Sequence, residues 1–145
     1  MFGFLKRKKT EKLTAQLAQT DARLALVKAE LAAQMVKLAG QTSDLAPLKQ
    51  AEEALSSARN FYTFENTPVE IGMVQVAIGD MLVKLGREKS DKSAFLRAKT
   101  AYRAAITLAS LHGDDALRKD LRNKMKLVEA LLGTGPKTPS LFRAA

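Results

Sequence analysis

A repeat with a period of 47 residues, the distance from position 35 to position 82, most constrains how this chain can fold. Residues 35–44 (MVKLAGQTSD) have a counterpart in residues 82–91 (LVKLGREKSD), where small residues match small residues and turn residues match turn residues. The same offset places Gly86 over Gly133. Periods of roughly 20 to 50 residues are typical of stacked units that bury their apolar faces on one another. We therefore expect neighbouring copies of one structural unit.

Capping and turn residues indicate that each unit consists of two helices. The segment 67–70 (TPVE) is typical of a helix start, with Thr67 as the cap, proline in the first turn and glutamate closing a capping box. Gly86 and Gly133 are typical of left-handed helix stops. Because alanine, leucine, lysine and glutamate predominate, helices are favoured over strands. We predict an all-α protein of antiparallel helical hairpins over residues 43–132, with helices at 44–62, 68–85, 91–111 and 114–133.

A long helix is expected before the repeats, because residues 10–38 contain neither glycine nor proline. Leucine recurs in it every seven positions at 17, 24, 31 and 38, and a neighbouring line at the same spacing is partly polar (Leu13, Thr20, Val27, Gln34). This is the pattern of a coiled coil that merges into the first repeat, with polar residues on one seam. One interpretation is self-association into a homo-oligomer. The alternative is an amphipathic helix that folds back onto the chain's own repeats. The expected oligomer seam consists of Leu13, Leu17, Leu24, Val27 and Leu31.

Small and aromatic residues within 75–106 follow a recognisable order. Ile78 and Gly79 stand together, and the next predicted helix has a small, aromatic, small, apolar series at Ala98, Tyr102, Ala105 and Ile106. This order resembles the tetratricopeptide repeat in a bacterial form, with Gly86 at the position of the inter-helix glycine. The resemblance covers about residues 28–132 and is specific in the middle copy alone. The chain departs from the family in its pitch of 47 residues, against about 34.

The resemblance also implies a partner-binding surface, because in that family the first helix of each repeat lines a concave face that holds a peptide or a helix. The corresponding helix here, 68–85, is apolar on most of its sides. An alternative for this helix is burial against its neighbours in the stack. Carried over by position, the residues expected to line a groove for a protein partner are Met73, Val76, Asp80, Val83 and Lys84.

The positive charge is concentrated at the two ends of the chain. The formal net charge is +9, from 24 lysines and arginines against 15 acidic residues. Such charge attracts an acidic protein, an anionic membrane or a nucleic acid, and a solvated helix face is the alternative. No aromatic platform or nucleic-acid-binding module accompanies the charge. The expected basic patch consists of Arg97, Lys99, Arg103, Arg118, Lys119, Arg122 and Lys126.

The first nine residues form an apolar and then basic tip. This order is the reverse of a secretory signal, and it resembles the short openings of some bacterial peripheral membrane proteins. Apolar side chains can insert at the headgroup boundary while the cations face anionic lipid, which gives reversible binding. A frayed, solvated helix start is the alternative. The tip residues are Phe2, Phe4, Leu5, Lys6, Arg7, Lys8 and Lys9.

Residues suited to catalysis or to cofactor binding are scarce. The chain has no cysteine and one histidine, so thiolate and multi-histidine metal sites are excluded. The segment 86–93 (GREKSDKS) differs from a phosphate-binding loop because Asp91 stands where glycine is required. We therefore expect no catalytic residues, metal or cofactor, and a flexible tail over 133–145. The sequence predicts a cytoplasmic, non-catalytic adaptor or scaffold, peripheral to the membrane; the alternative is a nucleic-acid-binding protein that uses the basic C-terminal repeat.

Overall fold

The computed structural model describes residues 2–56 and 67–133, without the side chains of residues 2–6 and 18. This part of the chain is all-α and contains no strand, as predicted. The predicted tail lies outside the described residues apart from Gly133, and so does the end of the helix predicted at 44–62. The helices are α1 (Phe2–Thr42), α2 (Ala46–Ser56), α3 (Val69–Lys89), α4 (Lys92–Leu111) and α5 (Asp115–Leu132).

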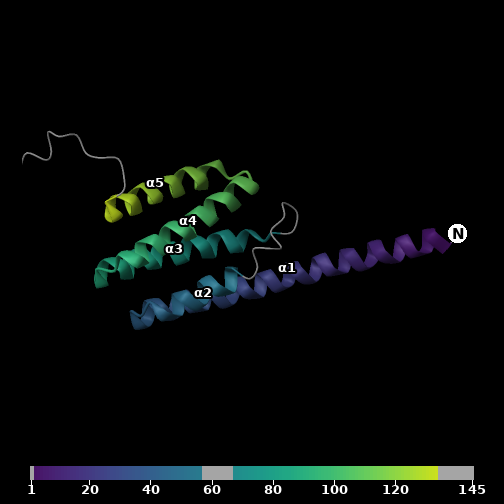
Figure 1. Ribbon diagram of the computed structural model, residues 1–145, viewed down its shortest axis with the longest axis horizontal. Coiled ribbons are helices and arrows are strands. Elements are labelled where there is room, and N and C mark those ends of the chain that lie inside the picture. Colours follow the sequence, from purple (N-terminus) through teal and green to yellow (C-terminus); the bar gives the residue numbers. More distant parts are fainter. Residues whose placement is uncertain (1, 57–66, 134–145) are drawn as a thin grey trace, which may run out of the picture.

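The helices pack side by side in the order of the chain (Figure 1). The closest neighbours are α1 with α2, α3 with α4 and α4 with α5, and α1 also contacts α3. The N-terminal half of α1 runs out beyond the other helices (Figure 1). The 41 residues of α1 make a helix about 60 Å long at 1.5 Å per residue. The described part of the chain therefore has a packed body and one projecting helix.

Two turns of the chain have the same local structure at an offset of 47 residues. Ser43 and Ser90 both have a left-handed backbone with φ of 53°. The carboxylates that follow them cap the next helix, because Asp44 Oδ1 accepts from the Ala46 amide at 3.0 Å and Asp91 Oδ1 accepts from the Ser93 amide at 2.9 Å. The Ser93 hydroxyl also donates to Asp91 at 2.6 Å, and this bond lowers the pKa of Asp91. The α1–α2 and α3–α4 turns thus use the same chemistry.

Two predicted helix ends are wrong, for identifiable reasons. Gly86 does not stop its helix, since α3 continues to Lys89 and Ser90 takes the left-handed position. Gly86 instead lies against α4, where an added Cβ would stand 2.9 Å from Phe95 Cε1. At the start of α3 the cap position belongs to Pro68 rather than Thr67. The predicted stop at Gly133 is confirmed by its φ of 74°.

The core combines small residues of α1 with large residues of the other helices. The inner face of α1 is almost entirely alanine, with Ala25, Ala29, Ala32 and Ala39 buried. Small side chains let α2 and α3 approach this helix closely, so its leucines are not needed for the contact. The largest fully buried side chains come from α2 to α5: Leu48, Leu55, Ile71, Ile78, Leu82, Leu85, Leu121 and Val128.

Candidate functional site

A row of exposed apolar residues on α1 is the most prominent surface feature of the described chain. We call it the α1 leucine row; its members are 46–64% exposed, and they are Leu13, Leu17, Leu24, Val27 and Leu31. These are the residues of the predicted oligomer seam. In the seven-residue repeat they lie on the side of α1 nearly opposite the buried alanines, so the body of the protein does not cover them.

The residues predicted to line a groove on α3 have different environments. Met73 and Lys84 are exposed, whereas Val76 and Val83 are half-buried and pack against the core. Asp80 is engaged by two other helices, because it accepts from the Tyr102 hydroxyl at 2.6 Å and from Lys124 Nζ at 3.0 Å. The structure therefore leaves Met73 as the exposed apolar residue of this predicted set.

The contacts of Asp80 join α3, α4 and α5. Burial raises the pKa of Tyr102, and its hydrogen bond to the Asp80 carboxylate raises it further. The phenol therefore stays protonated and donates, while Lys124 supplies the opposite charge to the same carboxylate. Because every group in the cluster is paired with another, we assign it to helix packing.

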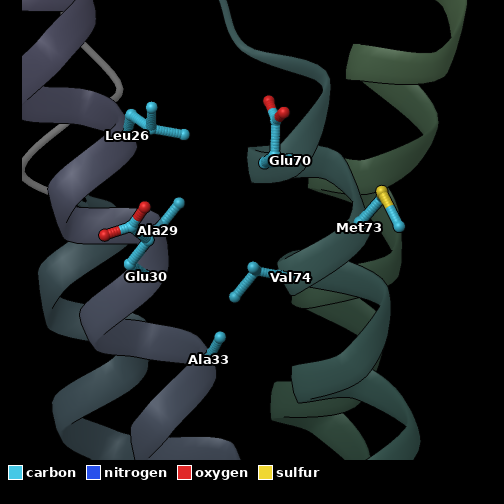
Figure 2. Close-up of a pocket in the computed structure, with 7 residues that line it drawn as sticks. All are labelled: Leu26, Ala29, Glu30, Ala33, Glu70, Met73 and Val74. Atoms are coloured by element: carbon cyan, nitrogen blue, oxygen red, sulfur yellow. The ribbon is translucent and has the colours of Figure 1, made fainter.

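An open pocket lies beside Met73, between α1 and α3 (Figure 2). Its volume is about 380 Å³, and Figure 2 shows Leu26 directed toward α3 and Val74 directed toward α1. Two carboxylates, Glu30 and Glu70, stand at its edge and give an apolar floor an acidic rim. The lining residues are Leu26, Ala29, Glu30, Ala33, Glu70, Met73 and Val74.

Sequence reasoning found Met73 in this pocket and missed its α1 side. Residues 26, 29, 30 and 33 recur at helical spacing, which is the one signal that could have indicated a second face of α1. Only the contact between α1 and α3, about 40 positions apart in sequence, shows that this face of α1 lies across from Val74 (Figure 2).

Internal ion pairs divide the predicted basic patch. Arg97 Nη2 lies 2.7 Å from Glu52 on α2, and Lys99 Nζ lies 3.6 Å from Glu129 on α5. Arg118 pairs within α5 with Asp115 at 3.3 Å. Arg97 and Lys99 thus join neighbouring helices, whereas Arg118 is paired within its own helix, so the patch is not a continuous set of unpaired cations. The exposed members of the patch are Arg103, Lys119, Arg122 and Lys126.

The predicted membrane tip belongs to the first turns of α1, because the helix begins at Phe2. Arg7, Lys8 and Lys9 are exposed. The side chains of Phe2, Phe4, Leu5 and Lys6 lie outside the described residues. The membrane contact therefore stays a prediction.

Over residues 2–56 and 67–133, no three His, Asp or Glu side chains gather so that they could bind a metal ion. No helix in these ranges has the length and apolar character needed to cross a bilayer. Comparison with protein-family models, with curated proteins and with solved structures finds no match to this chain.

Proposed function

We propose that this protein is a non-catalytic adaptor or scaffold built from tetratricopeptide-like antiparallel hairpins. It associates with itself through the α1 leucine row and binds a protein partner beside Met73. The exposure of the leucine row is the observation that carries the proposal. Large contiguous apolar surfaces on a folded protein are typical of interaction sites, because leaving them in water is unfavourable.

Two features of the body support repeated hairpins. The α1–α2 and α3–α4 turns share their left-handed serine and their aspartate cap at an offset of 47 residues, from Ser43 to Ser90. Within the second pair, Gly79 and Tyr102, which stand at the glycine and aromatic positions of the resemblance, meet at the α3–α4 contact. A stack of such pairs leaves surfaces for binding and needs no catalytic centre.

Replacing Leu13 and Leu17 together with glutamate is expected to shift the protein from oligomer to monomer. Both residues are exposed and precede Ala25, the first buried residue among the described side chains of α1, so the change leaves the packed body intact. Burying one leucine contributes about 1.5–3 kcal/mol, so we expect association to weaken at least about tenfold. Sedimentation equilibrium at high micromolar concentration measures the mass against the 15.8 kDa monomer.

The matched control carries the same two charges on another side of the same helix segment. Ala15 and Gln19 are exposed and lie outside the leucine row, so Ala15→Glu with Gln19→Glu should keep the wild-type mass. A wild-type chain that sediments as a monomer at this concentration would reject self-association.

The pocket beside Met73 is the place where we propose that a protein partner binds. Its apolar floor fits an apolar side chain, and the exposed Glu70 favours a partner with a basic residue beside that anchor. A nucleic acid is disfavoured at this acidic rim. The basic patch is little better suited to a nucleic acid, because Arg97 and Lys99 are paired with carboxylates of neighbouring helices.

Met73→Lys is expected to weaken binding of such a partner about tenfold, because it removes an apolar contact and adds a repulsive charge. The probe is a peptide selected on the wild-type protein from a random displayed library, and fluorescence anisotropy measures its affinity. Leu96→Lys is the control, since Leu96 is a similarly exposed apolar residue on α4. Equal losses in both variants, or selected peptides without basic residues, would contradict this placement.

The N-terminal tip is proposed to hold the protein reversibly at the cytoplasmic face of an anionic membrane. Arg7, Lys8 and Lys9 are exposed on the projecting end of α1, away from the packed body (Figure 1). Each cation near an anionic surface contributes about 1 kcal/mol to binding. A surface contact at this end leaves the pocket beside Met73 accessible.

A further inference from the structure

Charges beside the α1 leucine row specify how two copies would pair, and this inference rests on the proposed self-association. Arg23 and Glu30 lie seven residues apart along one edge of the row, and both are exposed. Asp21 and Lys28 lie seven residues apart along the other edge and are half-buried. Within residues 21–30 each edge therefore carries one positive and one negative residue, with the signs in opposite order. Residues at these edges face the partner helix in a coiled coil and select its orientation.

A parallel pair of α1 helices would bring like charges together. In that orientation a residue on one edge faces the residue five positions later on the other edge of the partner helix. Arg23 then faces the partner's Lys28, and the two-fold symmetry repeats this contact. No edge contact between opposite charges compensates, because Glu30 faces the partner's Met35 and Asp21 faces the partner's Gln16.

An antiparallel pair brings opposite charges together in one register, and we infer that the dimer adopts it. With Leu24 packed against the partner's Val27, the same-edge contacts join Arg23 to the partner's Glu30 and Asp21 to the partner's Lys28. The two-fold symmetry of the dimer forms each of these two contacts twice. Because Lys28 already has an interaction within its own chain, the exposed pair of Arg23 and Glu30 carries the argument.

Neighbouring antiparallel registers are unfavourable. A shift of seven residues in one direction places Arg23 against the partner's Arg23, and the same shift in the other direction places Glu30 against the partner's Glu30. In the favoured register Leu13 packs on the partner's Leu38, which is also exposed, and Leu17 packs on the partner's Gln34. The projecting half of each α1 thus covers the exposed face of the half that belongs to the partner's body.

This arrangement has a geometrical consequence for the N-terminal tips. Residue 5 of one chain lies level with position 46 of its partner in this register, so the two tips are separated by 41 residues of helix rise, or about 60 Å. A parallel pair would hold the tips side by side. The antiparallel dimer is therefore a rod with one basic tip at each end.

Cysteine cross-linking tests the orientation directly, because the chain contains no cysteine. Leu17→Cys and Gln34→Cys are prepared separately, the second with a larger affinity tag, and are mixed with a short bis-maleimide. The antiparallel register predicts a 17-to-34 product of intermediate mass, at least about tenfold above either product of like chains. In this register the two copies of position 17 lie about 25 Å apart, beyond the reach of the reagent.

The outcomes separate the orientation from the self-association on which it rests. Cross-linking of Leu17→Cys to itself would overturn the antiparallel arrangement and leave self-association standing. A dimeric mass without either product would overturn the register. A monomeric mass in sedimentation would reject both proposals together.

Charge reversal gives a second readout whose sign differs between the two orientations. Arg23→Glu should weaken the antiparallel dimer at least about threefold, by placing glutamate against the partner's Glu30, and adding Glu30→Arg should restore its stability. A parallel dimer would instead be strengthened by Arg23→Glu, because glutamate would then face the partner's Lys28. Tighter association of the single variant therefore overturns the inference.

Discussion

Gly79→Ala is expected to destabilise the protein by about 2 kcal/mol, although alanine is the better helix former by about 1 kcal/mol. A Cβ at this position would lie 2.5 Å from Tyr102 Cε1 and 2.8 Å from its Cδ1. The ring cannot easily move aside, because Tyr102 is buried and its hydroxyl is bonded to Asp80. The helices α3 and α4 would have to separate instead. Urea denaturation followed by circular dichroism measures the free energy of unfolding.

Gly72→Ala is the matched control for this prediction. Gly72 lies seven residues earlier on the same helix and faces the same neighbour, α4. There the added Cβ would meet Leu108 Cβ at 3.7 Å, an ordinary van der Waals distance. We therefore expect Gly72→Ala to be neutral or stabilising by up to about 1 kcal/mol. A gain in stability from both substitutions would contradict the close approach at Gly79.

These two glycines show which part of the fold the sequence could predict. Local signals were sufficient for helix content and for the stop at Gly133, because a left-handed glycine can end a helix without any distant contact. Gly86 was misread because its role depends on a contact with another helix, which local signals do not show. A glycine that ends a helix and a glycine that admits a neighbouring helix look alike in sequence, and the difference here depends on Phe95, nine positions away.

The candidate sites differ in the same respect: some depend on one helix alone, and others depend on contacts between helices. The row that includes Leu17 and Leu24 could be predicted from a seven-residue period within one helix. The alanines on another face of this helix are buried in the core. Predicting the pocket would have required knowing that Leu26 of α1 stands across from Val74 of α3. The ion pair of Arg97 with Glu52 likewise joins α4 to α2. Such contacts between distant segments are set by how the helices stack, which periodicity within a helix does not specify.

Replacing Arg7, Lys8 and Lys9 with glutamine is expected to weaken binding to anionic liposomes by roughly 100-fold. The three cations are exposed on the projecting end of α1, where they can approach a lipid surface without obstruction from the body (Figure 1). At about 1 kcal/mol each, their loss removes about 3 kcal/mol of attraction, and the effect should shrink as added salt screens the charges. Co-sedimentation with vesicles of graded phosphatidylserine content measures the binding constant.

The control for the tip removes the same charge from another part of the molecule. Arg87, Lys89 and Lys92 are exposed around the α3–α4 turn, and their joint replacement with glutamine lowers the net charge by the same three units. If the tip itself contacts lipid, this second triple variant should bind within about threefold of the wild-type protein. Equal weakening in both variants would show that net charge alone drives adsorption. Equal pelleting of the chain with and without residues 1–9 would remove the membrane contact from the proposal.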